Sequence, residues 1–169
     1  LPHTEVRIEE PDENGIGEIL CKSESVMLGY LDDPAETAAT IQDGWLHTGD
    51  YGYFDSEGFL YITGRKKNVI VTKNGKNIFP EEVELYLGKS GFIAECMVYG
   101  VDDAASGETV VCAEIFPDHA SIEEANGPLY GQALRALLKV EIEKANDRLP
   151  PYKRIRRFDI RETEFEKTG

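Results

Sequence analysis

Asp50 and Arg65 are the two residues whose types and spacing best suit chemistry with a nucleotide. Asp50 follows the residues HTG, and Arg65 comes fifteen positions later, directly before two lysines. An ionised carboxylate accepts two hydrogen bonds at once, so it suits the 2′ and 3′ hydroxyls of a ribose. A guanidinium donates hydrogen bonds in a fork that matches phosphate. A hairpin with its turn near residues 55–58 would return Arg65 to the neighbourhood of Asp50.

Each of these two residues also has a purely structural interpretation. Aspartate is common at turns, so Asp50 could simply end a strand or cap the turn in LHTGDYG. The pair could equally form a plain cross-strand salt bridge between Asp50 and Arg65. The spacing therefore predicts that the two side chains lie close together, and it leaves both interpretations of that closeness open.

Gly75 is the third candidate, in the stretch VTKNGKNIFPEEVE. A glycine supplies either a turn position with positive φ or a place where a ligand must approach the backbone closely. The turn alone is sufficient to explain Asn74-Gly75. The sequence shows no GxxxxGK[ST] phosphate loop, no Ser/His/Asp set and no metal-ligand spacing, so the candidates are binding residues rather than nucleophiles or metal ligands.

The net charge of −14 argues against a general nucleic-acid binder or a protein held on anionic membranes, because phosphate backbones bind positive surfaces. Basic residues gather in two islands, residues 65–76 and 151–158. In an acidic protein such islands are candidate sites for phosphate groups. Solvated faces beside structural strands are the alternative explanation.

The cysteines Cys21, Cys96 and Cys112 form no CxxC pair, and two of them lie inside apolar runs where a thiol behaves as a small hydrophobic group. We therefore expect a reduced, cytoplasmic protein. No apolar stretch approaches the roughly 20 residues of a membrane span, and no secretory signal opens the sequence. The chain begins without methionine on residues that already resemble a strand, so we expect it to be a fragment.

Residues 4–63 are predicted to be rich in β-structure. Strands are expected at TEVRIEE, at GEILCK and on either side of the turn at residues 55–58. One short helix is expected in DDPAETAAT, where Asp32 and Asp33 can cap and Pro34 occupies an early helical position.

After Arg65 the pattern changes to alternating strands and helices. Strands are expected at NVIVT, CMVYGV, TVVCAEIF and residues 154–160, and helices after Pro80 and over residues 130–148. We therefore predict an α+β fold with a small β-rich unit over residues 1–66 and a compact α+β domain over residues 67–169.

The ordered run from GEILCK through HTGD and GRKKNVIVTKNGKNIFPEEVE to EFEKTG resembles the adenylate-forming, AMP-binding superfamily of acyl-CoA synthetases, firefly-type luciferases and peptide-synthetase adenylation domains. The match covers essentially the whole chain, and several motifs occur in the family's order. GRKKNVIVTKNGKNIFPEEVE with the late FEKTG is most similar to bacterial long-chain fatty acid–CoA ligases. The resemblance implies that residues 1–66 are the final β-subdomain of the N-terminal AMP-binding domain and that residues 67–169 form the C-terminal lid domain.

The resemblance also implies roles for individual residues. Asp50, the acid of HTGD, would bind the ribose hydroxyls of ATP and of the acyl-adenylate, and Arg65 of GRxK would assist at the nucleotide. Lys67 takes the position of the family's hinge. Gly75 would line the tunnel for the pantetheine arm of CoA. The family's adenylation lysine would lie a few positions beyond Gly169, so the fragment itself is expected to be inactive.

The reaction that the resemblance implies uses ATP, Mg²⁺ and CoA. A fatty acid is activated as acyl-adenylate with release of pyrophosphate, the small domain swings, and the CoA thiol then takes the acyl group. No nucleic-acid partner or transmembrane segment is expected, while peripheral membrane contact by the full-length protein stays open. Two alternatives remain: an adenylation domain that loads a carrier protein, and a non-catalytic module that recruits a partner through its acidic surface.

Overall fold

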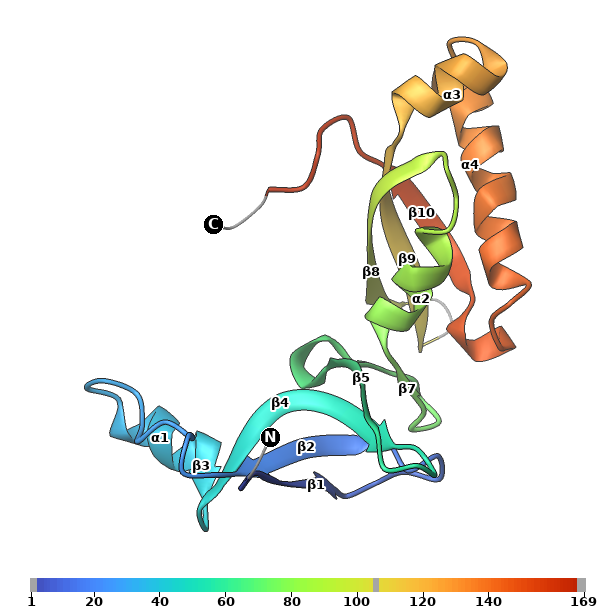
Figure 1. Ribbon diagram of the computed structural model, residues 1–169. Coiled ribbons are helices and arrows are strands. Elements are labelled where there is room, and N and C mark those ends of the chain that lie inside the picture. Colours follow the sequence, from blue (N-terminus) through green and yellow to red (C-terminus); the bar gives the residue numbers. More distant parts are fainter. Residues whose placement is uncertain (1–2, 105–106, 167–169) are drawn as a thin grey trace. The chain divides into compact units, whose positions relative to one another are not determined.

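The computed structural model describes residues 3–104 and 107–166 of the chain (Figure 1). The chain divides into two compact units, Leu1–Lys67 and Asn68–Gly169. The first unit carries one short helix beside its strands, whereas the second unit combines strands with three longer helices among the described residues. The fold is therefore mixed α+β, as the sequence predicts.

The first unit is built on an antiparallel sheet with β4 at its centre. Its elements are β1 (Glu5–Glu9), β2 (Gly17–Lys22), α1 (Pro34–Thr40), β3 (Ile41–Gln42), β4 (Trp45–Phe54) and β5 (Leu60–Arg65). The strands follow the order β1-β2-β4-β3, and β5 also pairs with β4. Because β4 pairs with β2, β3 and β5, it ties the whole unit together.

The short helix α1 begins as its sequence indicates. Asp33 is the N-cap, and its carboxylate accepts a hydrogen bond from the Glu36 backbone N–H at 2.9 Å. Pro34 occupies the first helical position, where its missing N–H costs nothing. Asp32 does not share the capping role, because it lies in the left-handed region with φ of 56°.

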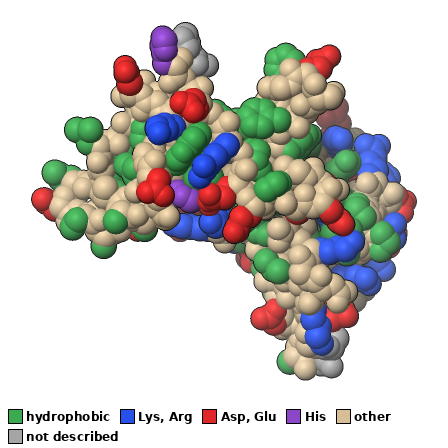
Figure 2. All heavy atoms as spheres, turned by 90° about the horizontal axis from the view of Figure 1, so that it is seen from below, with side chains coloured by type: hydrophobic (Ala, Val, Ile, Leu, Met, Phe, Trp, Pro, Cys, Tyr) green, Lys and Arg blue, Asp and Glu red, His purple; other side chains and the backbone are tan. Residues whose placement is uncertain are grey.

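The first unit buries little apolar surface. Among the residues that the structure describes, its buried hydrophobic side chains are Ile19 and Leu20. Leu28 and Leu31 are almost fully exposed, at 102% and 92%, and Figure 2 shows apolar side chains among charged ones on the face in view. The other exposed large hydrophobic residues of this unit are Met27, Tyr30, Phe54, Phe59, Leu60, Tyr61 and Ile62. Exposed apolar surface of this extent is typical of a face that contacts another body.

The second unit has a three-stranded sheet in the order β10-β9-β8 and a two-stranded ribbon of β6 and β7. Its elements are β6 (Ile70–Val71), β7 (Asn77–Ile78), α2 (Pro80–Leu87), β8 (Ile93–Asp103), β9 (Glu108–Pro117), α3 (His119–Asn126), α4 (Gly131–Asn146) and β10 (Ile155–Ile160). β8 and β9 are antiparallel, whereas β10 runs parallel to β9. The parallel pairing requires a long crossover, which α3 and α4 supply.

The core of the second unit lies between its sheet and the helices α2 and α4, which contact β8 and β10 respectively (Figure 1). Buried residues recur at helical spacing along α4, at Leu134, Leu138 and Ile142. Val83 and Leu87 of α2 are buried in the same cluster. The predicted amphipathic face of residues 130–148 therefore does cover the sheet, which gives this unit a continuous core.

Two features of the second unit differ from the sequence prediction. The strand expected at NVIVT shrinks to two residues, Ile70–Val71, because its partner β7 is equally short. The helix α3 was not predicted, since it buries only Ile122 and so shows almost no amphipathic pattern. Asp118 caps α3 by accepting a hydrogen bond from the Ser121 N–H at 3.0 Å.

Candidate functional site

Asp50 and Arg65 face each other across the hairpin of β4 and β5. They are direct partners in the strand register, and Arg65 Nε lies 3.0 Å from Asp50 Oδ1. The hairpin turns at residues 55–58, where the Gly58 N–H donates to the Asp55 carbonyl at 3.1 Å. The predicted turn and the predicted closeness of Asp50 and Arg65 are both confirmed.

The segment before Asp50 is held to the neighbouring strand β2. Thr48 Oγ1 donates to the Ile19 carbonyl at 2.7 Å, and it accepts a hydrogen bond from the Asp50 N–H at 3.1 Å. Gly49 has φ of 71°, a conformation that residues with side chains rarely adopt. The chain therefore needs a glycine at position 49. Thr48, which precedes it, holds the backbone of Asp50 through the hydrogen bond to its N–H.

The Asp50–Arg65 pair is accessible to a ligand. The Asp50 side chain is 27% exposed and that of Arg65 is 69% exposed. Ion pairs that face solvent contribute only about 0–1 kcal/mol to stability, so a ligand can replace part of this contact at little cost. The geometry places an acceptor and a donor side by side, which suits a ligand that offers hydroxyls next to phosphate.

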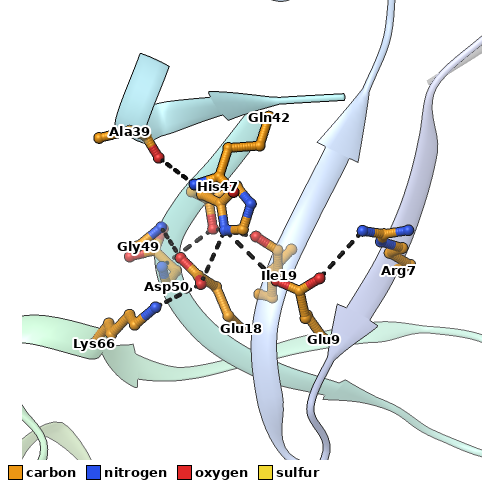
Figure 3. Close-up of polar contacts among 11 residues, drawn as sticks. Arg7, Glu9, Glu18, Ile19, Ala39, Gln42, His47, Gly49, Asp50 and Lys66 are labelled. Atoms are coloured by element: carbon orange, nitrogen blue, oxygen red, sulfur yellow. Dashed lines mark hydrogen bonds and ion pairs between the residues drawn. The ribbon is translucent and has the colours of Figure 1, made fainter. Parts of the chain in front are cut away.

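A second polar cluster lies beside this pair, centred on Glu18 of β2 (Figure 3). Glu18 Oε2 lies 2.7 Å from Lys66 Nζ and 3.2 Å from His47 Nδ1. The Gly49 N–H donates to Glu18 Oε1 at 3.3 Å. His47 also approaches Glu9, with Nδ1 at 3.7 Å from Oε2. Glu18 is thus a nearly buried residue, 7% exposed, whose carboxylate contacts Lys66, His47 and the backbone of Gly49.

The cluster behaves as an ion-pair network. Burial alone raises the pKa of the Glu18 carboxyl, but the hydrogen bonds from Lys66 and His47 outweigh burial, so the pKa lies below its ordinary value. The hydrogen bond to Glu18 raises the pKa of Lys66. Ligand atoms of Glu9, Glu18 and His47 lie within 4.8 Å of one another, which could suit a metal ion. The Lys66 ammonium already occupies the Glu18 oxygen that such an ion would need, so these residues fit a salt bridge better than a metal.

Lys67 lies in the single turn of 3₁₀-helix over Lys66–Asn68. It is the last residue of the first unit, and its side chain is exposed. Element-terminal residues of this kind commonly absorb the torsion changes of a hinge. The position suits the predicted hinge, and a hinge movement at Lys67 remains a prediction.

Gly75 closes a tight turn between β6 and β7. Its N–H donates to the Thr72 carbonyl at 2.8 Å, and its φ is 74°. A Cβ built on Gly75 would meet no atom within 4 Å among the described residues. The positive φ therefore accounts for this glycine without a close ligand, and a role in a pantetheine tunnel stays a prediction.

Parts of the two basic islands meet in one hollow of the second unit, with a volume of about 430 Å³. The cations that line it are Lys73, Lys76, Arg154, Arg156 and Arg157. Tyr152 forms part of the wall, and Lys76 Nζ lies 4.8 Å from the centre of its ring. Several cations around one concave surface form a suitable binding site for phosphate groups.

Sequence reasoning missed the Glu18 cluster. It identified both basic islands as candidate phosphate sites, but not that they meet in one hollow. For Glu18 a sequence signal existed, because a charged residue stands directly before the apolar residues of GEILCK. In the structure the first four residues of this strand are all buried. No local signal indicates that the two islands lie together. The two basic segments meet only because β10 pairs with β9 in the folded unit, more than seventy residues after the turn at Gly75.

The first unit thus presents an acceptor–donor pair on a hairpin, and the second unit presents a hollow lined by five cations. Residues 82–169 match the family model described as the AMP-binding enzyme C-terminal domain. The chain therefore belongs to the family of adenylate-forming, AMP-binding enzymes. This confirms the resemblance that the motifs indicate.

Similar proteins include CoA ligases for several carboxylates. The chain is 41% identical over 153 residues to a long-chain-fatty-acid–CoA ligase of Bacillus subtilis, a match that covers 90% of this chain and 24% of the relative. It is 36% identical to an indoleacetate–CoA ligase of Aromatoleum aromaticum, covering 99% of this chain and 34% of the relative. The chain thus spans between a quarter and about a third of the length of these relatives.

A solved structure shows the same fold. The o-succinylbenzoate CoA synthetase of Bacillus subtilis, in complex with its acyl-adenylate intermediate, has a TM-score of 0.76 and 32% sequence identity; the match covers 96% of this chain and 31% of that one. The relatives therefore share an adenylate-forming CoA ligase framework and differ in the acid that their names specify. Within the described part of the chain, no helix is both long and apolar enough to cross a membrane.

Proposed function

We propose that this chain is the C-terminal part of an AMP-forming CoA ligase that acts on long-chain fatty acids. The first unit would be the last β-subdomain of the large nucleotide-binding domain, and the second unit its C-terminal lid. The observation that carries the proposal is the direct cross-strand pairing of Asp50 with Arg65 at 3.0 Å. The identity to a long-chain-fatty-acid–CoA ligase over 90% of the chain supports the choice of substrate.

The exposed apolar side chains of the first unit support its place in a larger domain. Leu28 and Leu31 extend into solvent from the loop before α1, and five further large hydrophobic side chains are exposed on β4, β5 and the turn between them. A face of this kind is stabilised when another body covers it. In the proposed protein that body is the rest of the nucleotide-binding domain.

The geometry of Asp50 and Arg65 supports the roles proposed for them. The Asp50 carboxylate would accept hydrogen bonds from the two ribose hydroxyls, while Arg65 would donate to oxygens of the nucleotide. Their mutual ion pair holds both side chains near these positions before ATP arrives, which lowers the entropy lost on binding. Mg²⁺ would enter together with ATP, bound to the ATP phosphates. The Glu9, Glu18 and His47 group does not fit this ion, which prefers an octahedral set of oxygen ligands.

The second half-reaction would use the basic hollow. CoA carries phosphate groups on its nucleotide end, and Lys73, Lys76 and the arginines of residues 154–157 could hold them by charge-assisted hydrogen bonds. The thiol end would approach along the turn of Gly75. A movement at Lys67 would exchange the surfaces that the second unit presents, so that one cleft serves adenylation and then thioester formation.

Substrate assays on the longer protein test the proposal. We expect ATP–pyrophosphate exchange to depend on a carboxylate, with long-chain fatty acids preferred over indoleacetate and o-succinylbenzoate. Thioester formation should proceed with free CoA. A preference for either aromatic acid would refute the fatty-acid substrate, and transfer only to the phosphopantetheine of a carrier protein would refute the CoA acceptor.

The hollow provides a separate test of CoA binding. The variant Arg156→Ala should raise the KM for CoA by about tenfold, the effect of losing one charge-assisted hydrogen bond. The KM for ATP should stay unchanged, because the first unit carries the proposed nucleotide contacts. Lys139→Ala is a matched control, since it removes a cation from α4 of the same unit outside the hollow. An equal rise in both KM values would contradict this assignment.

A further inference from the structure

The end of the first unit is held by a buried carboxylate. Lys66 Nζ lies 2.7 Å from Oε2 of Glu18, which is 7% exposed. Arg65, one residue earlier, is tied to Asp50 by its own ion pair. Glu18 comes from β2 and Asp50 from β4, so two different strands fix two consecutive residues. The side chains of Arg65 and Lys66 are therefore both tied to strands of the first unit.

The start of the second unit is held in a similar way. The Asn68 side chain donates from Nδ2 to Glu81 Oε1 of α2 at 3.1 Å. Two residues later Ile70 is 5% exposed and pairs with Ile78 in the ribbon of β6 and β7. The backbone from Asn68 onward is therefore attached to the second unit.

Lys67 is the one residue between these two attachments. Its side chain is exposed, and within residues 3–104 and 107–166 it makes no side-chain hydrogen bond or ion pair. A torsion change at Lys67 breaks none of the four contacts made by its neighbours. A change in φ of Lys66 or in ψ of Asn68 would break at least one, because it moves that side chain away from its partner.

We propose that Glu18 and Asn68 are positioning residues that confine the hinge movement to Lys67. Glu18 acts through Lys66, and Asn68 acts through Glu81. The inference rests on the proposed function in that it requires two productive orientations of the second unit. If Lys66 is released, rotation spreads over several residues, the second unit samples more orientations, and each productive one is less populated.

Proteolysis of this chain tests the attachment without any need for activity. Trypsin can cut after Arg65, Lys66 or Lys67, and each cut requires that side chain to enter the protease's specificity pocket. For Arg65 and Lys66 an ion pair must break first, whereas among the described residues Lys67 has no ion pair to lose. In the native chain we expect cutting after Lys67 to exceed cutting after Lys66, once both are normalised to the unfolded chain. In Glu18→Gln, cutting after Lys66 relative to Lys67 should rise about tenfold, the effect of one charge-assisted hydrogen bond. Mass spectrometry of the fragments identifies each cut.

Two variants keep this test decisive. Glu9→Gln changes a carboxylate of the same cluster that does not bind Lys66, and it should leave the ratio of the cuts unchanged. Lys66→Met guards against loss of fold in the Glu18 variant, because it alters a side chain that is 52% exposed. In that variant the cut after Arg65 should increase relative to the cut after Lys67. If the ratios of both Glu18→Gln and Lys66→Met equal those of the native chain, the proposal is wrong.

Kinetics of the longer protein test the consequence for catalysis. Glu18→Gln should lower kcat several-fold with the KM for ATP unchanged, because Asp50 and Arg65 are intact. Lys66→Arg should keep the native kcat, since arginine keeps the charge and the hydrogen-bond donors, whereas Lys66→Met should lower kcat as Glu18→Gln does. A rise in the KM for ATP of Glu18→Gln, or a kcat of Lys66→Arg as low as that of Lys66→Met, would show a general structural defect instead. If the native longer protein forms no acyl-adenylate, the proposed function fails, and the proteolysis result still decides whether Lys66 is held.

Discussion

Replacing Asp50 by asparagine separates nucleotide binding from stability. Asparagine keeps the shape of the side chain and one acceptor oxygen, but it loses the charge and the second acceptor. Hydrogen bonds to a charged partner contribute about 1.5–3 kcal/mol, and each 1.4 kcal/mol is a factor of ten. Because the Asp50 side chain is 27% exposed, we expect the lower part of this range to hold, with a rise of about tenfold to thirtyfold in the KM for ATP.

The cost to folding should be much smaller. The partner Arg65 is 69% exposed, and ion pairs in such positions contribute about 0–1 kcal/mol. For a protein of this size that corresponds to a decrease in Tm of no more than about 4 °C. The variant should therefore fold normally and bind ATP poorly.

Steady-state kinetics of the longer protein at several ATP concentrations provide the assay, with thermal unfolding measured on the same preparation. Glu114→Gln is a matched control, because Glu114 is 28% exposed and also pairs with an arginine, Arg161. Its KM for ATP should equal that of the native protein. An unchanged KM for ATP in Asp50→Asn would refute the ribose contact and leave the salt bridge as the whole role of Asp50.

Three further predictions concern the hinge, the turn and the Glu18 cluster. Lys67→Pro fixes φ near −65°. It should impair one of the two half-reactions, pyrophosphate exchange or thioester formation, several-fold more than the other. An equal loss in both would contradict a hinge at Lys67. Gly75→Ala should lower the free energy of unfolding by about 1–2 kcal/mol in denaturant titrations, because φ is 74° although the space is open. Glu18→Gln should lose stability at neutral pH. In the folded protein the pKa of Glu18 is lowered and that of Lys66 is raised. The difference in free energy of unfolding between Glu18→Gln and the native protein should therefore persist between about pH 4.5 and 10.5 and shrink as acid protonates Glu18. A difference that grows in acid would be inconsistent with this pair.

Local patterns were enough to predict the hairpin and its pair. The short turn returns β5 along β4, so the approach of Arg65 to Asp50 could be predicted from the spacing. Their direct pairing also depends on a register shift between Tyr51 and Gly52, which the sequence does not reveal. The helix over Gly131–Asn146 was predicted because its buried residues recur at helical spacing. Both features depend on interactions between near neighbours in sequence.

Contacts between distant segments could not be predicted in this way. Glu18 and Lys66 are 48 positions apart, and their meeting depends on the pairing of β2 with β4 and of β4 with β5. The basic hollow depends on the parallel pairing of β10 with β9, which the composition of RIRRFDI does not specify. The helix α3 was missed for a different reason, since a helix that buries one residue has no periodic signal to detect.

The uneven distribution of buried residues gives the two units different resistance to heat. Nearly all of the tightly packed side chains belong to the second unit, which has a core of its own. It should melt as one cooperative body whether or not the other half is folded. Among its described residues the first unit buries two aliphatic side chains, Ile19 and Leu20, so its melting temperature should depend on what lies against Leu28 and Leu31. Calorimetry should then resolve two transitions, and only the earlier one should move when that neighbour changes.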